Sequence, residues 1–174
     1  DGPIAGVFTK NHIPAAPVLL GRKHLKKQIG RAIFVNSGNA NACTGKQGQI
    51  DAEEMAQLIA VQLATPRFKV FIGSTGVIGP CLPMTRIQKG VQALMSGLRK
   101  SGHRDAATAI MTTDTTVKEV AVRTKIGGKI VTIGGMAKGS GMIHPNMATM
   151  LAYITSDVSI TPNLLQTSLN QAVN

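Results

Sequence analysis

The segment 73–79 contains glycines, a serine and a threonine, residue types that can stabilise a negatively charged oxygen. The segment Gly73-Ser74-Thr75-Gly76-Val77-Ile78-Gly79 follows residues 69–72, a predicted strand that we expect Gly73 to end. A strand that runs into such a loop can aim N–H groups and a hydroxyl at one point, and losing one such donor costs on the order of 10²–10³ in rate. A glycine turn before a helix explains the same residues without chemistry, and is the simpler interpretation of this segment alone.

A second glycine-rich segment, Gly134 to Met150, contains a lysine and a threonine with chemical potential. It is not a phosphate loop, because the GxxxxGK[ST] spacing is missing and Gly139-x-Gly141 lacks the third glycine of a dinucleotide fingerprint. We therefore reject nucleotide binding here. A lone lysine such as Lys138 is commonly a solvated charge, and a lone threonine at a strand start, such as Thr149 after Ala148, is commonly structural. His144, beside Pro145, is either a base or, more commonly, a surface residue.

A third polar segment, Asn36 to Gly45, follows the short apolar run 32–35. Its three asparagines and two glycines supply turn-forming side chains and a permissive backbone. Asparagine side chains that bond their own backbone are the simpler interpretation of each residue taken alone. The functional alternative is a loop that braces a neighbouring site.

The composition indicates a globular chain. Its 174 residues suffice for one compact core and part of a second, with 43% hydrophobic and 16% charged residues. It contains no apolar run of 18 or more residues, so we expect no membrane span. Cys43 and Cys81 belong to no CxxC pair, so we expect neither a metal site nor a disulfide framework, and a reducing cytosol fits best. The sequence starts at Asp1 without Met and stops at Asn174 inside a predicted helix, which favours a truncated polypeptide.

The charge balance raises the question of nucleic-acid binding. The chain has 19 basic and 8 acidic residues, for a formal charge of +11. Only 3% of its residues are aromatic, which leaves few platforms for stacking bases, and no nucleic-acid-binding motif occurs. The one dense basic run, 22–27, is typical of a solvated loop. We therefore favour a missing partner segment or anionic small substrates as the reason for the charge.

The elements that must position these residues alternate between strands and helices. Strands are predicted at 4–9, 32–35, 69–72, 117–124 and 129–133, the last two joined by a hairpin turn at Gly127-Gly128. One helix is predicted to begin at a capping box, Asp51-x-x-Glu54, with Met55, Leu58, Ile59 and Leu63 on one face. Another is entered at Thr85, carries apolar residues from Ile87 to Leu98 and is weakened by Gly97; a last one has Thr161 as its cap and Pro162 at its first position. The pattern predicts an α/β or α+β fold in which helices cover sheets.

Taken together and in order, these segments resemble the ornithine acetyltransferase family, also called bifunctional glutamate N-acetyltransferase. The resemblance extends over most of the chain, and its combined signal is strong although no single piece is. The matching stretches are Gly6-Val7-Phe8-Thr9, Ala15-Ala16-Pro17-Val18, Asn36 to Gly45, Ser74 to Gly79 with Leu82-Pro83-Met84, Ile110 to Thr115, and Lys138-Gly139-x-Gly141-Met142 through Met147-Ala148-Thr149-Met150-Leu151.

The resemblance implies a precursor that cuts itself before a threonine and yields two chains that stay together. By motif match the cut falls between Ala148 and Thr149. Residues 1–148 then form the portion of the first (alpha) chain, and 149–174 the truncated start of the second (beta) chain. The threonine hydroxyl attacks the preceding carbonyl, and hydrolysis of the ester frees an α-amine of ordinary pKa about 8, which can act as the base for that hydroxyl.

The resemblance also implies a reaction and roles for particular residues. Family members move an acetyl group from N-acetylornithine to glutamate in arginine biosynthesis, through an acetyl-threonine intermediate and by a ping-pong mechanism. Thr149 matches the nucleophile, Thr75 and Gly76 the oxyanion hole, and Thr112 and Lys138 substrate-binding positions. No cofactor is implied, although some members accept acetyl-coenzyme A as donor. The family fold is a sandwich of two β-layers flanked by helices.

Several expectations about partners and alternatives accompany this resemblance. The second chain of the family supplies pocket residues beyond position 174, and we expect a higher oligomer of such two-chain units in the cytoplasm, without nucleic acid or membrane. A short leader before Asp1 is expected to be lacking. A self-processed aminopeptidase or amidohydrolase of the same fold, which releases acyl groups to water, remains an alternative. So does an acyltransferase of secondary metabolism with another acyl substrate.

Overall fold

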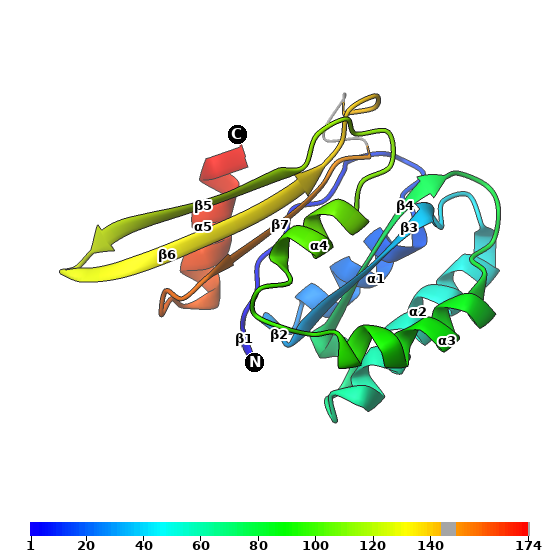
Figure 1. Ribbon diagram of the computed structural model, residues 1–174, viewed down its shortest axis with the longest axis horizontal. Coiled ribbons are helices and arrows are strands. Elements are labelled where there is room, and N and C mark those ends of the chain that lie inside the picture. The colour runs from blue at the N-terminus through cyan, green and yellow to red at the C-terminus, as the bar shows by residue number, and fades with distance from the viewer. Residues whose placement is uncertain (144–148, 174) are drawn as a thin grey trace.

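The computed structural model describes residues 1–143 and 149–173, which form two β-layers with helices (Figure 1). In chain order the elements are β1 (Gly2–Pro3), α1 (Ala16–Leu25), β2 (Ile29–Gly30), β3 (Ala32–Asn39), α2 (Gly45–Gln62), the 3₁₀ helix η1 (Arg67–Lys69), β4 (Val70–Val77), α3 (Met84–Ser96), α4 (His103–Ala109), β5 (Lys118–Ile126), β6 (Lys129–Lys138), β7 (Leu151–Ser156) and α5 (Pro162–Val173). This arrangement confirms the expected mixture of helices and sheets.

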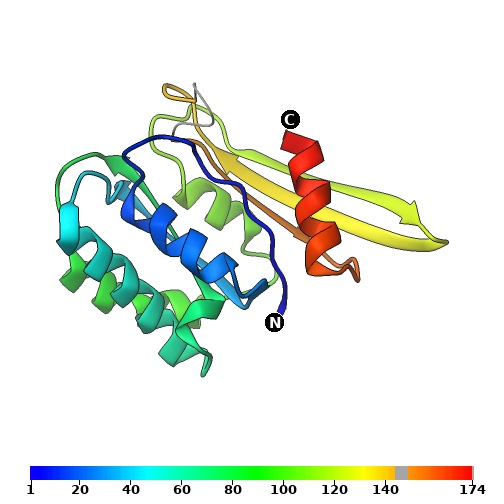
Figure 2. The ribbon, with the colours of Figure 1, turned by 180° about the vertical axis from the view of Figure 1, so that it is seen from behind.

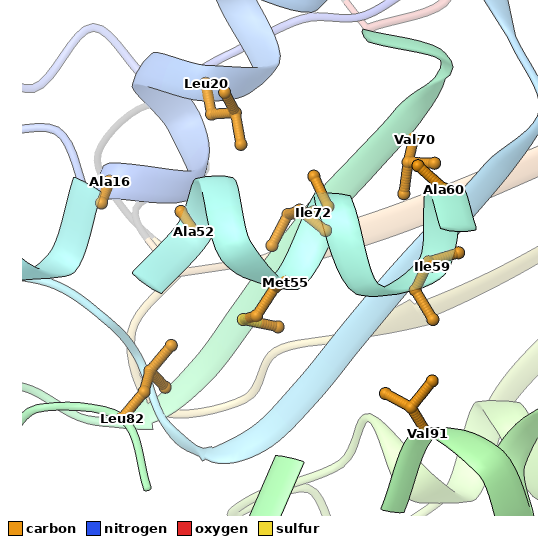
Figure 3. Packing of buried hydrophobic residues seen from close by; sticks show 11 residues of the cluster. Ala16, Leu20, Ala52, Met55, Ile59, Ala60, Val70, Ile72, Leu82 and Val91 are labelled. Atoms are coloured by element: carbon orange, nitrogen blue, oxygen red, sulfur yellow. The ribbon is translucent and has the colours of Figure 1, made fainter. Parts of the chain in front are cut away.

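The first layer is the parallel pair β3–β4 with its covering helices. The two strands are in register from Ala32 opposite Val70 to Asn39 opposite Val77, and α2 connects them. A parallel pair needs such a crossover, and burying apolar residues between strand and helix stabilises it by about 25 cal/mol per Å². The core lies between β4 and helices α1, α2 and α3, as Figure 3 shows for ten labelled residues: Ala16, Leu20, Ala52, Met55, Ile59, Ala60, Val70, Ile72, Leu82 and Val91.

The second layer is the antiparallel sheet β5–β6–β7. Its first two strands form the predicted hairpin, in which Gly127 and Gly128 take the positive φ angles of 55° and 82° that only glycine adopts at little cost. Both strands are longer than predicted, and β6 continues through Gly134 and Gly135 to Lys138. The predicted loop from Gly134 therefore begins as a strand, because pairing with β5 on one side and β7 on the other supplies its hydrogen bonds.

The predicted end at Gly73 of the strand that starts at residue 69 is wrong. β4 continues to Val77, and the Tyr153 hydroxyl of β7 occupies the space beside Gly73. A Cβ atom built on Gly73 lies 2.1 Å from that hydroxyl. Glycine at this position therefore allows the two layers to approach each other rather than ending the strand.

The predicted strand at 4–9 is absent from this part of the chain. Only Gly2–Pro3 forms a short strand, with β2. The backbone of Gly6 instead bonds to a side chain of α5: the Gln166 Oε1 accepts from the Gly6 N–H at 3.0 Å, and Gln166 Nε2 donates to the Gly6 carbonyl at 3.1 Å. One amide side chain thus takes the place of a neighbouring strand. Figures 1 and 2 show the chain start running beside α5.

The predicted capping box at Asp51 is also wrong. Helix α2 begins at Gly45, so Asp51 lies within it and is only 3% exposed. Its carboxylate accepts a hydrogen bond of 2.8 Å from Gln47 Nε2, one helical turn earlier. The predicted apolar face is confirmed, because Met55 and Ile59 are buried and the neighbouring leucines pack on the same core.

The basic run at 22–27 is solvated, as predicted for its arginine and lysines, but its first part is helical and is not a loop. Residues 22–25 form the last turn of α1, where positive side chains complement the helix dipole. Arg22 donates to the Thr9 carbonyl at 2.6 Å and lies over the Phe8 ring, and Lys23 pairs with Glu53 at 3.4 Å. His24 is 4% exposed, with Nδ1 at 2.9 Å from the Val70 carbonyl. These contacts hold α1 on β4 and α2.

The two remaining helix predictions are confirmed at their starts. α3 begins one residue before Thr85 and ends at its cap Gly97, and α5 begins at Pro162. The Thr161 hydroxyl accepts from the Leu164 N–H at 3.4 Å, as its predicted role as cap requires. The short helix α4 was not predicted. Within the described ranges, every helix is too short or too polar to cross a bilayer.

Candidate active site

Thr75 and Gly76 belong to the last part of β4 rather than to a free loop. Thr75 lies opposite Ser37 of β3 and is 4% exposed. Gly76 has a φ of 131°, and a Cβ there lies 2.3 Å from the carbonyl carbon of Gly38 on β3. Because only glycine fits between the strands here, the residue type of Gly76 has a packing explanation that does not depend on an oxyanion hole.

Lys138 is buried, so its interpretation as a solvated charge is wrong. It is the last residue of β6, lies opposite Leu151 of β7 and is 4% exposed. Within residues 1–143 and 149–173, no carboxylate lies within ion-pair distance of its ammonium group. A buried charge is costly without a counter-charge, so this position favours an anionic ligand.

Lys138 and Thr75 lie on facing sides of the two layers. Side chains alternate along a strand, so Lys138 shares a face with Tyr153, and Thr75 shares a face with Gly73. The Tyr153 hydroxyl against Gly73 shows that these two faces meet. We call the space between them the seam.

The ends of the strands place both residues at one end of the seam. Figures 1 and 2 show the carboxyl end of β4 beside the start of β7, at the same side of the molecule. Thr75 and Val77 approach this end along β4, and Leu151 opposite Lys138 is the first residue of β7. Residues of β4, β6 and β7 therefore lie at this end of the seam.

Three buried polar atoms, one of which faces the seam, have no hydrogen-bond partner among the described residues. They are the Tyr153 hydroxyl, the Ser74 hydroxyl and the Asn36 Oδ1, of which Ser74 and Asn36 are opposite each other on β4 and β3. Burial raises the pKa of the Tyr153 phenol above its ordinary value, so it stays protonated. Tyr153 was not among the residues predicted from the sequence.

Thr149 precedes β7 by two residues and is held by the backbone of the segment before it. Its N–H and its hydroxyl both donate to the Met142 carbonyl, at 3.1 Å and 2.6 Å. The predicted nucleophile therefore lies at the end of the seam where β7 begins. Ala148, on the other side of the predicted cut, and His144 lie outside the described residues.

Thr112 is exposed, and a neighbouring aspartate connects its backbone to the glycine after Lys138. Asp114 Oδ2 accepts from the Thr112 N–H at 3.3 Å, and Oδ1 accepts from the Gly139 N–H at 2.7 Å and from Lys118 Nζ at 2.6 Å. Burial of this carboxylate opposes its ionisation, but the three donors outweigh it and hold the pKa of Asp114 well below its usual range. Only the i,i+4 spacing to Lys118 could have drawn attention to Asp114, because Gly139 is 25 residues away.

In the segment Asn36 to Gly45, the asparagine side chains bond to nearby backbone, which is the simpler of the two interpretations given for it. Asn36 Nδ2 donates to the Asn39 carbonyl at 2.9 Å. Asn41 is fully buried; its Nδ2 donates to the Gly48 carbonyl at 2.9 Å, and its Oδ1 accepts from the Thr44 hydroxyl at 2.7 Å. These bonds connect the end of β3 to the start of α2, so they shape the backbone beside the seam. In the part of the chain that the structure describes, no three His, Cys, Asp or Glu side chains are grouped to hold a metal ion.

Known proteins resemble this chain over its whole length. The model of the ArgJ family matches residues 1–174. The arginine biosynthesis bifunctional protein ArgJ of Symbiobacterium thermophilum is 51% identical over 170 residues, which are 98% of this chain and 42% of that protein. The protein of the same name from Caldanaerobacter subterraneus subsp. tengcongensis is 48% identical over 171 residues, with the same two coverages of 98% and 42%. The chain thus spans about two fifths of the length of these curated relatives.

Two crystal structures share the fold. The arginine biosynthesis bifunctional protein ArgJ of Bacillus halodurans has a TM-score of 0.76 and 42% identity, covering 84% of this chain and 78% of that chain. The ornithine acetyltransferase of Mycobacterium tuberculosis, solved with ornithine, has a TM-score of 0.73 and 38% identity, covering 85% of this chain and 79% of that chain. A family match over every residue, with the same fold in solved members, establishes that the chain belongs to the ArgJ family.

Proposed function

We propose that this chain carries the nucleophile of an enzyme that transfers an acetyl group from N-acetylornithine to L-glutamate in arginine biosynthesis. Thr149 is the nucleophile, made available by self-cleavage of the bond between Ala148 and Thr149. The observation that carries the proposal is the buried Lys138, which lacks a carboxylate partner among the described residues and lies at the end of the seam where β7 begins. A buried ammonium group at this place is suited to the carboxylate that donor and acceptor both possess.

Self-cleavage needs no group beyond Thr149 and water. The hydroxyl oxygen attacks the carbonyl carbon of Ala148, the C–N bond breaks, and the hydroxyl proton passes to the nitrogen, which becomes the free α-amine. Water then hydrolyses the ester between the two residues, which leaves a carboxylate on Ala148 and the free hydroxyl on Thr149. The Met142 carbonyl, which accepts from both the N–H and the hydroxyl of Thr149, orients the residue during this chemistry.

The extents of the matches support a division before Thr149. The chain covers 42% of the first curated relatives but 78% and 79% of the two solved chains. The solved chains are therefore much shorter than those relatives. Residues 1–148 are 148 of 174 residues, or 85% of the chain. The solved chains cover 84% and 85% of it, which is the share expected if they end at the equivalent of Ala148.

Acetyl transfer then takes two steps at the same hydroxyl. The α-amine of Thr149 accepts the hydroxyl proton as the oxygen attacks the acetyl carbonyl of N-acetylornithine, and ornithine leaves as the amine. The amine of glutamate attacks the acetyl-threonine ester and restores the hydroxyl. The Thr75 hydroxyl and the Gly76 N–H stabilise the oxyanion of each step, while Lys138 and Thr112 bind substrate. Acetyl-coenzyme A is an alternative donor, and no cofactor takes part.

The second chain of the precursor completes this site. The outer face of the sheet β5–β7 presents apolar side chains, with Val120, Val122 and Ile154 each more than half exposed. A sheet face of this kind is normally buried against another layer. We therefore infer that the second chain covers this face of the sheet and supplies further pocket residues. The complete protein is then a cytoplasmic assembly of several two-chain units.

The test of self-cleavage is the fragment pattern of the full-length protein. We expect two fragments under denaturing conditions, the second of which begins Thr-Met-Leu-Ala-Tyr. Thr149→Ala should remain uncut, while Thr149→Ser, which keeps the hydroxyl, should still cut. Cleavage at this bond in Thr149→Ala would contradict the proposal.

The test of the reaction is a comparison of its products. With N-acetylornithine and glutamate, we expect N-acetylglutamate and ornithine in equal amounts, and little free acetate. Acetate as the main product would instead identify a hydrolase of the aminopeptidase kind. Lys138→Met should lower kcat/KM for both substrates by about 10-fold or more, the loss expected for a hydrogen bond to a charged group, because both bind in one pocket. An unchanged kcat/KM would remove Lys138 from the site.

A further inference from the structure

The carboxylate of Asp114 joins two segments of the site that the sequence separates. One segment is the turn after α4 that carries Thr112, and the other is the turn after β6 that follows Lys138. Its side chain is fully covered, with an exposed fraction of 0%. Both of its oxygens are used: Oδ2 by the Thr112 N–H, and Oδ1 by the Gly139 N–H and Lys118 Nζ.

The position of this link relative to Thr149 suggests what it does. Gly139 has a φ of 146°, and a Cβ built on it lies 3.0 Å from Ile143 and 3.3 Å from Met150, the residue after Thr149. Thr149 itself bonds to Met142, at the far end of the same turn. The turn 139–143 is therefore held by Asp114 on one side and packs against the nucleophile on the other.

A second bond between the same two segments supports the link. The hydroxyls of Thr113 and Ser140 lie 3.0 Å apart. Lys118, the cation on Asp114, is the first residue of β5 and lies opposite Ala137, next to Lys138 in the chain. The turn after α4 is thus bound through side chains to two consecutive residues of the other segment, Gly139 and Ser140.

We propose that Asp114 is the positioning residue of this site: by binding the backbone of Thr112 and of Gly139 together, it sets the place of Lys138 and of the turn that holds Thr149. It does not touch substrate and takes no part in proton transfer. Hydrogen bonds to a charged acceptor are stronger than neutral ones, which makes an ionised carboxylate suited to hold two backbone segments. The inference rests on the proposed acetyl transfer, but its structural part can be tested separately.

The experiment uses Asp114→Asn in the full-length protein, with Asp105→Asn as the matched control. Asp105 makes a comparable ion pair, with Arg99, but its side chain is 70% exposed. We expect Asp114→Asn to lower kcat/KM for N-acetylornithine by about 10-fold, mostly through KM, since one of the charged bonds is lost. The control should stay within about 2-fold of the wild type.

A double variant distinguishes positioning from a merely structural role. If Asp114 acts through Lys138, Asp114→Asn should add little to the loss already caused by Lys138→Met, since coupled residues are non-additive. Independent, multiplying losses would overturn the inference. If Asp114→Asn does not accumulate as folded protein, Asp114→Glu replaces it, because it keeps the charge but displaces the oxygens, and the same rise in KM is expected.

Hydrogen exchange provides a readout that does not depend on activity. The amides of 139–143 should exchange faster in Asp114→Asn than in the wild type, and not in the control. If the wild type transfers acetyl normally, but Asp114→Asn has the same KM and the same hydrogen-exchange rates as Asp105→Asn, the positioning role is wrong and the proposed function stands. If the wild type transfers no acetyl group, the proposed function fails, and the exchange rates still decide whether Asp114 holds the turn.

Discussion

The two β-layers differ in how far the described residues complete them. In the first layer, Val70, Met55 and Ala52 have an exposed fraction of 0%, because α1 and α2 cover β4 and α3 packs on α2. In the second layer, all nine residues of β5 are exposed, and Ile154 on β7 is 58% exposed. The first layer thus has its own core, whereas the second contributes one face to the seam and leaves the other open to a further layer. The candidate site lies at the boundary between the two.

The same substitution in each layer tests this difference most strongly. Ile59→Ala, at a residue 3% exposed in α2, should lower the free energy of unfolding of the full-length protein by about 2–5 kcal/mol, as for other buried isoleucines. Ile154→Ala should cost nearly as much if the second chain covers the outer sheet. Urea unfolding of both variants measures this. A cost below about 1 kcal/mol for Ile154→Ala would show that this face stays exposed and would contradict the proposed cover.

Function should depend on the hydroxyl of Thr75 in the seam between the layers. Thr75→Val keeps the volume of Thr75 and removes only its hydroxyl, so it should lower kcat for acetyl transfer by on the order of 10²-fold with little change in melting temperature. Thr75→Ser keeps the hydroxyl and should retain most of the activity. Gly76→Ala cannot serve this purpose, because its Cβ would clash with Gly38. Wild-type turnover in Thr75→Val would leave Thr75 with a structural role alone.

The contact between the layers can be tested by adding one carbon and removing one oxygen. Gly73→Ala places a Cβ 2.1 Å from the Tyr153 hydroxyl, and should cost about 1–3 kcal/mol, as overpacking does. Tyr153→Phe removes the oxygen and leaves the ring carbon at 3.4 Å, an ordinary contact. The double variant should therefore recover most of the lost stability. Additive effects of the two changes in thermal unfolding would mean that the layers do not meet at Gly73.

The smallest expected effect concerns pH and the first layer. Burial lowers the pKa of His24 below its ordinary 6.5, although its bond to Val70 opposes the shift. Because the unfolded chain then binds a proton more readily than the folded one, His24 should destabilise the fold as pH falls through about 6.5 and below, and be neutral above it. His24→Gln should show a flatter loss of stability between pH 7.5 and about 5.5 than the wild type. Parallel pH curves for the two proteins would rule out this contribution.

Local patterns predicted the elements that depend on local chemistry. The hairpin at Gly127-Gly128 and the start of α5 at Thr161-Pro162 are confirmed, because turn glycines and helix caps act within a few residues. Gly73 was misread as a strand end. A glycine is needed there because the hydroxyl of Tyr153, a residue 80 positions later and in the other layer, occupies the space of a side chain. The extended segment around Gly6 has Gln166 as its partner, which no short window of sequence contains.

The candidate site also has a part that the sequence predicts and a part that depends on distant contacts. Thr149, Thr75 and Lys138 were named by resemblance to a family, and their roles remain predictions. The burial of Lys138 was not predictable, because it depends on the facing layer rather than on neighbouring residues. Asp114 was missed for a related reason: its bond to Gly139 joins segments 25 residues apart. Residue types indicate which chemistry is available, and packing between layers decides which residues can take part.

The central claim is that Thr149 receives the acetyl group. Its most direct test is intact-mass analysis of the processed full-length protein after incubation with N-acetylornithine and no acceptor. We expect the fragment that begins at Thr149 to gain the mass of one acetyl group, to keep it until glutamate is added, and then to lose it as N-acetylglutamate forms. Fragmentation should place the group on Thr149. Turnover without an adduct on that fragment, or an adduct on another residue, would contradict the account.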